Sequence, residues 1–169
     1  MAARRAALKP VASSAPGGRT IRILIAEDNA VNQRVAVRMV EKLGLRADVA
    51  ADGREAIQLF QMLPYDLILM DCQMPNMDGY EAAREIRRRE PPGGSSLIVA
   101  MTAEAMAGSR ERCLEAGMDD YIAKPVRFDD LSAVLNKWLP GNDSREGPRR
   151  SQPSTRRPTQ DHPAQRLTS

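Results

Sequence analysis

Five polar residues stand directly after short apolar runs of the sequence: Glu27, Asp28, Asp71, Thr102 and Lys124. If these runs are neighbouring parallel strands, all five side chains meet at one edge of a sheet, where open α/β sheets bind their ligands. Three crowded carboxylates repel one another unless a cation or protons offset their charge. Oxygen ligands that are few in number and open to water suit Mg²⁺ better than a caged Ca²⁺ or a metal that prefers thiolates.

An aspartate held beside Mg²⁺, with an ammonium and a hydroxyl facing it, is an arrangement suited to phosphoryl transfer. Asp71 would attack the phosphorus, the metal and Lys124 would offset charge on the equatorial oxygens, and an acyl phosphate would result. The alternative interpretation gives each residue a helix cap or a surface ion pair. That interpretation accounts for one or two such residues, but it does not account for five at matched strand ends.

The elements that must position these residues follow from hydrophobic periodicity. The sequence predicts strands over 21–26, 46–50, 66–71, 97–101 and 120–123. It predicts helices over 31–43, 53–63, 79–89, 105–116 and 128–139. The third strand is apolar on both faces, which is typical of a parallel strand buried between helices. This alternation predicts a flavodoxin-like α/β fold: a single doubly wound five-stranded parallel sheet of order 2-1-3-4-5, with helices on both faces.

Charge is distributed unevenly along the 169 residues. Residues 1–20 contain four basic residues and no acid, and residues 141–169 contain six Arg and three acids. Because the whole chain has a net charge of only +3, the middle of the chain is acidic. We therefore expect a disordered basic lead over 1–20, a domain over 21–140 that does not bind nucleic acid, and a disordered Pro/Arg-rich tail over 141–169.

Cysteine usage and hydropathy indicate the compartment. Cys72 and Cys113 do not show the spacing of a disulfide framework or of a cysteine metal site, so we expect reduced thiols in a reducing compartment. No run approaches the ~18 apolar residues of a membrane span, and the start lacks the apolar region of a secretory signal. These features predict a cytoplasmic protein without a membrane span. Because no histidine-bearing dimerisation helix or ATP-binding glycine-rich segment is present, we expect any kinase to be another polypeptide.

Four motifs together resemble the receiver domain of two-component response regulators. They are Ile23–Asn29, Met70–Gly79 with its Asp-Cys-Gln-Met-Pro, Met101–Ala103, and Ala116–Pro125 with its Lys-Pro. The likeness covers about residues 21–139, and the residues of these motifs are most similar to those in receivers of hybrid sensor histidine kinases. It implies the CheY-like version of the predicted fold.

The resemblance implies a role for each site residue. Asp71 would be the phosphoacceptor for a histidine of a kinase or of a phosphotransfer protein. Glu27 and Asp28 would hold Mg²⁺ (or Mn²⁺) together with Asp71 and the backbone carbonyl of Gln73. Lys124 would pair with the phosphoryl group. The protein would catalyse only its own phosphorylation and dephosphorylation, and would otherwise not be an enzyme.

The resemblance also implies a conformational switch and a cis peptide bond, and it reveals one position at which the chain differs from the family pattern. Thr102 would move to bond the phosphoryl group and Tyr121 would swing inward, which changes the face formed by 105–116, 120–123 and 128–139 and allows a phosphorylation-dependent dimer. The Lys124–Pro125 bond would be cis. Glu104 departs from the hybrid-type pattern, which more often has Asn. Gln73 and Glu104 each lie two residues beyond a site residue, and we expect them to set the lifetime of the phosphoryl group.

Two other functions remain as alternatives. A phosphatase of the haloacid dehalogenase type also uses an Asp nucleophile and Mg²⁺ on an α/β sheet. Members of that family carry an Asp-x-Asp motif after their first strand, whereas here the residue two positions after Asp71 is Gln73. The chain also has no insertion large enough for a cap domain. The second alternative is a binding module that works without phosphorylation, although no site residue is missing here.

Overall fold

Five parallel strands form one sheet of order β2-β1-β3-β4-β5 in the computed structural model, which describes residues 21–94, 96–103 and 107–139. The strands are β1 (Ile23–Ala26), β2 (Ala47–Ala50), β3 (Leu67–Asp71), β4 (Leu97–Thr102) and β5 (Asp120–Ala123). The helices are α1 (Ala30–Lys42), α2 (Gly53–Met62), α3 (Gly79–Arg89), α4 (Ala107–Glu115) and α5 (Phe128–Trp138). The predicted doubly wound fold and strand order are confirmed.

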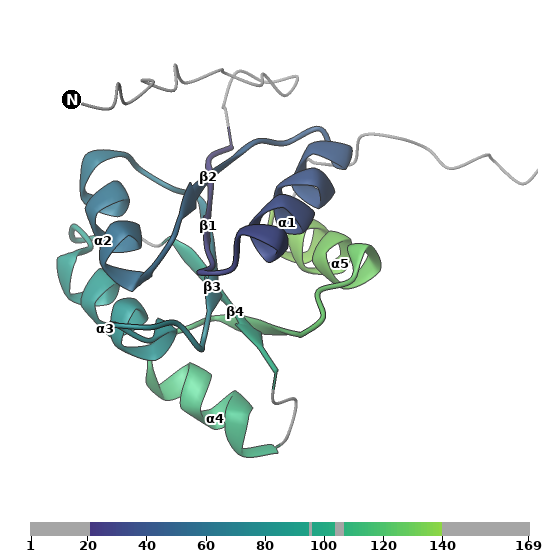
Figure 1. Cartoon of the computed structure of the whole chain (residues 1–169). Helices are drawn as coiled ribbons and strands as arrows, with labels where there is room; N and C mark the ends of the chain where they lie inside the picture. The colour runs from purple at the N-terminus through teal and green to yellow at the C-terminus, as the bar shows by residue number, and fades with distance from the viewer. Residues whose placement is uncertain (1–20, 95, 104–106, 140–169) are drawn as a thin grey trace, which may run out of the picture.

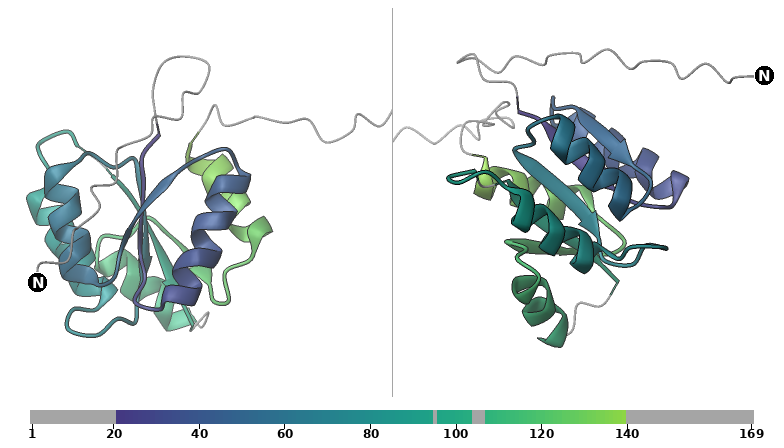
Figure 2. Two further views of the ribbon diagram at one scale, coloured as in Figure 1. Left: turned by 45° about the horizontal axis from the view of Figure 1, so that its top comes forward. Right: turned by 90° about the vertical axis from the view of Figure 1, so that its left-hand side faces the viewer.

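Helices cover both faces of the sheet. α1 and α5 lie on one face, and α2, α3 and α4 lie on the other (Figure 1; Figure 2 gives two further views). Each face has its own apolar core: Leu24 and Met70 belong to the core under α2, α3 and α4, whereas Ile25 and Leu69 belong to the core under α1 and α5. Because both faces are covered, all five residues of β3 are buried, which explains its uninterrupted apolar run.

Polar caps and glycines set the helix ends close to their predicted positions. The side chains of Asn29, Asp52 and Asp78 accept hydrogen bonds from backbone N–H groups in the first turns of α1, α2 and α3. Gly44 and Gly117 follow α1 and α4 with positive φ angles of 76° and 85°, a conformation that glycine adopts without a steric penalty. Residues 105 and 106 of the predicted fourth helix lie outside the described residues. No helix in the described part of the chain is both long enough and apolar enough to cross a bilayer.

One arginine of α3, Arg87, contacts both the start of β4 and the turn before β5. Arg87 donates from Nε to the carbonyl oxygen of Gly117 (2.7 Å) and from Nη1 to the carbonyl oxygen of Ser96 (2.7 Å). It also forms ion pairs with Glu90 (2.9 Å) and Asp119 (2.6 Å). These partners lie at the amino ends of the strands, opposite the edge at which the predicted site residues lie.

Candidate functional site

The carboxyl ends of β1, β3, β4 and β5 bring the predicted site residues to one edge of the sheet. Ala26 is in register with Met70, so Glu27, which follows β1, lies next to Asp71, the last residue of β3. Lys124 follows β5, and its backbone N–H donates to the carbonyl oxygen of Thr102 (2.7 Å), the last residue of β4. The register of a parallel sheet therefore gathers residues that are almost 100 positions apart in the chain.

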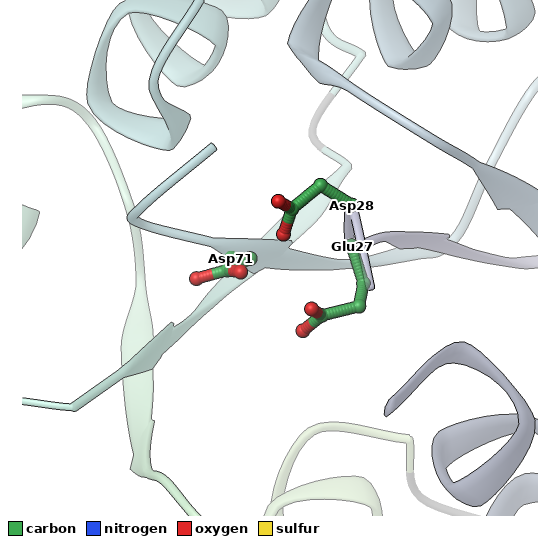
Figure 3. A group of neighbouring side chains, drawn as sticks. All are labelled: Glu27, Asp28 and Asp71. Atoms are coloured by element: carbon green, nitrogen blue, oxygen red, sulfur yellow. The ribbon is translucent and has the colours of Figure 1, made fainter. Parts of the chain in front are cut away.

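Three carboxylates converge at this edge. Glu27, Asp28 and Asp71 each offer an oxygen atom, and these atoms all lie within 4.8 Å of one another (Figure 3). Glu27 and Asp71 are each only 2% exposed, whereas Asp28 is exposed. The cluster thus has two buried members and one that faces water.

One ammonium group joins the two buried carboxylates. Lys124 Nζ lies 2.7 Å from Asp71 Oδ2 and 2.8 Å from Glu27 Oε2. A single positive charge offsets two buried negative charges only in part, and Asp28 adds a third. The cluster therefore retains a net negative charge that favours a further cation.

Glu27 is also held by amide groups of the first turn that follows it. Its Oε1 accepts hydrogen bonds from the Asn29 backbone N–H (3.2 Å) and from Asn32 Nδ2 (3.1 Å). Gln33 Nε2 donates to the Glu27 carbonyl oxygen (2.6 Å). Sequence reasoning missed Asn32 and Gln33. The signal was available, because both residues lie in the first turn of a helix that begins directly after the two carboxylates.

The loop after β3 holds Asp71 from its other side. The Gln73 backbone N–H donates to Asp71 Oδ1 (3.0 Å). Gly79 opens α3 so close to this loop that a Cβ atom there would overlap the carbonyl oxygen of Asp71 and lie 3.0 Å from the Cα of Cys72. Glycine at this position is what allows α3 to pack directly against the end of β3.

The pKa values of the three central groups follow from burial and from these contacts. Burial raises the pKa of Asp71, and the hydrogen bonds from Lys124 and Gln73 only partly oppose this effect. Burial alone would also raise the pKa of Glu27, but the hydrogen bonds from Lys124 and from the amide donors outweigh it and lower this pKa. Burial would lower the pKa of Lys124, but its bonds to the two carboxylates raise it. Lys124 is therefore positively charged at neutral pH.

The donor set fits a small hard divalent cation. All three candidate ligands are carboxylates, the cluster offers neither sulfur nor imidazole, and Asp28 faces solvent, which leaves room for coordinated water. Few protein oxygens plus water is the pattern of Mg²⁺ sites, whereas Ca²⁺ sites usually enclose the ion with six to eight oxygen ligands.

The remaining predicted residues lie around this cluster. Thr102 is buried (4% exposed) at the end of β4, Gln73 is exposed in the loop after β3, and Tyr121 on β5 is 37% exposed. The peptide bond between Lys124 and Pro125 is cis. Glu104 lies outside the described residues.

Comparison with known protein families gives one match over most of the described chain. Residues 23–136 match the response regulator receiver domain. The chain is 48% identical over 117 residues to the hybrid signal transduction protein dokA of Dictyostelium discoideum, which covers 69% of this chain and 7% of that protein. It is 36% identical over 120 residues to the signal transduction histidine-protein kinase BarA of Escherichia coli K12, which covers 71% of this chain and 13% of that protein. The chain therefore spans only a small part of the length of these relatives.

Solved structures of receiver domains are also similar to this chain. The receiver domain of the sensor histidine kinase PA1611 from Pseudomonas aeruginosa, crystallised with magnesium coordinated in its active-site cleft, is 47% identical with a TM-score of 0.64. That match covers 70% of this chain and 96% of the other. The receiver domain of Ssk1 from Saccharomyces cerevisiae, co-crystallised with the phosphotransfer protein Ypd1, is 34% identical with a TM-score of 0.65, and the match covers 70% and 88% of the two chains.

Proposed function

The chain belongs to the response regulator receiver family, and from this premise we propose that Asp71 accepts a phosphoryl group from a phosphohistidine of a kinase or phosphotransfer protein. The observation that supports this most directly is the setting of Asp71: a buried carboxylate at the end of the central strand, 2.7 Å from an ammonium and within a cluster of three acids. Neither the phosphatase nor the phosphorylation-independent binding module finds support in the comparisons.

Mg²⁺ is the cofactor that we propose, with Mn²⁺ as a substitute of similar ligand preference. Glu27, Asp28 and Asp71 would hold it, together with the backbone carbonyl of Gln73. When bound, the ion neutralises charge on the phosphoryl oxygens and on the attacking carboxylate. The magnesium in the cleft of the PA1611 receiver supports this assignment.

The chain's own residues position the reaction. The Gln73 backbone N–H and the Lys124 ammonium each bond one oxygen of Asp71, so the carboxylate is oriented before a donor arrives. As the phosphorus–nitrogen bond of the donor breaks and the new bond to Asp71 forms, Lys124 would shift from the carboxylates to the phosphoryl oxygens. The amide groups that hold Glu27 would keep that side chain in place when Lys124 leaves it.

The response to phosphorylation would pass through Thr102 and Tyr121. Thr102 ends β4 next to the site, and its carbonyl oxygen accepts the Lys124 backbone N–H, so the ends of β4 and β5 are directly connected. Movement of Thr102 toward the phosphoryl group would free space for the partly exposed Tyr121 to turn inward. This change would alter the face formed by α4, β5 and α5, on which a phosphorylation-dependent dimer or another partner would depend.

Gln73 and Glu104 would set the lifetime of the acyl phosphate. The exposed side chain of Gln73 follows Asp71 closely enough to orient or block an attacking water, which must approach in line with the bond that breaks. Replacing Gln73 by Ala and Glu104 by Asn is expected to change the dephosphorylation rate several-fold, or about 1 kcal/mol in the barrier. Time courses of phosphate loss measure this rate, and unchanged decay in the double variant would refute the assignment.

The partner that donates the phosphoryl group would dock on α1. Val31 and Val35 are 64% and 44% exposed, lie one helical turn apart, and belong to the helix that begins directly after Glu27 and Asp28. Exposed Arg34 and Arg38 flank them, so the surface suits a partner with an apolar patch and acidic neighbours. The Ypd1 complex of the Ssk1 receiver supports a phosphotransfer protein as that partner.

A pair of charge substitutions tests this surface. Val35→Asp should slow phosphoryl transfer from a phosphotransfer protein at least tenfold, while phosphorylation by acetyl phosphate should not change. Met62→Asp is the matched control, because Met62 is also exposed (74%) but lies at the end of α2. Equal transfer rates for the two variants would remove α1 from the proposal.

Phosphorylation of the Asp71→Asn variant tests the function itself. Asn has nearly the same shape but no nucleophilic carboxylate, so the fold should persist while phosphorylation by a kinase, acetyl phosphate or phosphoramidate is lost. In the wild type the label should require Mg²⁺ or Mn²⁺ and should be released by hydroxylamine. Label that persists on the variant at the wild-type level would contradict the proposal.

A further inference from the structure

A pocket of about 180 Å³ opens beside the phosphoacceptor on the side of α3 and α4. Among the described residues it is lined by Cys72, Gln73, Asp78, Tyr80, Thr102 and Arg112. Cys72 and Gln73 directly follow Asp71, and Thr102 ends the adjacent strand, so one wall of the pocket is continuous with the phosphoryl-accepting site. None of the three clustered carboxylates lines it.

The pocket presents a positive charge on a fixed support. The guanidinium carbon of Arg112, an exposed residue of α4, lies 4.8 Å from the centre of the Tyr80 ring on α3. Tyr80 and Cys72 both line the pocket, so the ring that supports the guanidinium belongs to the same wall as the residue after Asp71. Asp78 also lines the pocket, but its Oδ1 accepts the Glu81 backbone N–H (2.7 Å) at the start of α3, where the helix dipole favours a negative charge.

The groups on the other sides of Asp71 have other roles. Glu27 and Asp28 lie on the β1 side and would hold the proposed Mg²⁺. Lys124 lies on the β5 side, where it already pairs with two carboxylates. The pocket with Arg112 therefore gives a departing carboxylate a cationic neighbour, and none of the three clustered acids lines it.

We propose that this pocket binds the acyl end of small acyl phosphates, so that Arg112 selects donors whose leaving group is a carboxylate. The inference rests on the proposed phosphorylation of Asp71. In the reaction, an oxygen of the Asp71 carboxylate forms a bond to phosphorus while the bond between phosphorus and the acyl oxygen breaks. The bonding electron pair departs with that oxygen, which yields a carboxylate such as acetate and needs no proton.

Size and charge agree with such a ligand. A pocket of about 180 Å³ accommodates a group as small as acetyl. Negative charge develops on the acyl oxygen as the bond breaks, so a guanidinium in the pocket stabilises the transition state more than the bound donor. A donor whose leaving group is small and neutral gains nothing from this charge.

Two phosphodonors separate this role from general attraction of anions. Acetyl phosphate releases acetate, whereas phosphoramidate releases ammonia, and both are anionic. The wild type, Arg112→Gln and the control Arg110→Gln are incubated with each donor and Mg²⁺, and mass spectrometry follows phosphorylation to give second-order rate constants. Arg110 is exposed on the same helix but does not line the pocket.

We expect Arg112→Gln to lower the rate constant for acetyl phosphate about threefold to fivefold, the effect of one partly exposed charge contact. The rate constant for phosphoramidate should stay within experimental error, and Arg110→Gln should change neither. Equal losses for both donors, or no loss for acetyl phosphate, would overturn the role of the pocket while leaving Asp71 as phosphoacceptor. If neither donor phosphorylates the wild type, the proposed function fails instead.

Discussion

Replacing Arg87 by Ala should destabilise the domain far more than replacing a neighbouring arginine. The Arg87 guanidinium bonds the carbonyl oxygens of Gly117 and Ser96 and two carboxylates, and these partners come from three separate segments of the chain. In Arg87→Ala, the Glu90 and Asp119 carboxylates would lose their cation at once.

The expected magnitude follows from the burial of these groups. Removing one partner of a buried ion pair costs about 3–5 kcal/mol. The side chains of Arg87, Glu90 and Asp119 are 22%, 11% and 32% exposed, so solvent screening lowers this figure. Each carboxylate also keeps one backbone N–H donor, from Ser96 and Ile98 respectively. We therefore expect a loss of about 3 kcal/mol, which lowers the Tm of a domain of about 120 residues by about 10–15 °C.

Denaturant unfolding measures this loss. Fluorescence of Trp138, the single tryptophan of the chain, and far-UV circular dichroism report the transition. Arg88→Ala is the control, because Arg88 is 72% exposed and, within the described part of the chain, forms its ion pair with Glu85 on its own helix, so its loss should cost less than about 0.5 kcal/mol. Arg87→Lys should recover only part of the difference, since an ammonium lacks the planar fork. If Arg87→Ala and Arg88→Ala unfold at the same denaturant concentration, the reasoning is wrong.

Three shorter predictions concern the site and its surroundings. Gly79→Ala should cost about 2 kcal/mol or more and slow phosphorylation, because its Cβ would overlap the Asp71 backbone. Gly108→Ala should be neutral or slightly stabilising in the same unfolding assay, because a Cβ at Gly108 would meet no other described residue within 4 Å. Burial would raise the pKa of Asp120, but hydrogen bonds to its charged form outweigh burial and lower this pKa. The charged carboxylate therefore stabilises the fold above its ordinary pKa of 3.8, and this stabilisation is lost as pH falls below that value. Asp120→Asn should thus be about 1 kcal/mol less stable than the wild type at pH 7, and a difference that persists at low pH would contradict this assignment. Mg²⁺ should raise the Tm of the wild type but have much less effect on Asp71→Asn, as thermal scans with and without the ion would show.

Much of the fold could be predicted from the sequence because covered parallel strands leave a simple pattern. β3 is buried on both faces, so its run of apolar residues marks it without ambiguity, and Asp71 at its end is conspicuous for the same reason. The site could be predicted in outline because parallel strands place their carboxyl ends at one edge. Knowing only that Glu27 and Lys124 follow strands is enough to bring them together.

The contacts between side chains could not be predicted in the same way. Arg87 lies in a run of three arginines, and nothing in the sequence distinguishes it from Arg88; only the packing of α3 against the α4–β5 turn does so. Arg112 likewise becomes part of a pocket only because α4 packs beside α3 and places its guanidinium over Tyr80. Such roles depend on the relative positions of helices, which periodicity does not determine.

Chemical mapping of the phosphoryl group tests the central claim most directly. The protein would be phosphorylated with acetyl phosphate and Mg²⁺ and then treated with sodium borohydride, which reduces an aspartyl phosphate to homoserine. Peptide mass spectrometry then locates the modified position. Homoserine at position 71, absent when donor or Mg²⁺ is omitted, is the predicted result. Modification at Asp28, at Glu27 or at any other carboxylate instead of Asp71 would contradict the account.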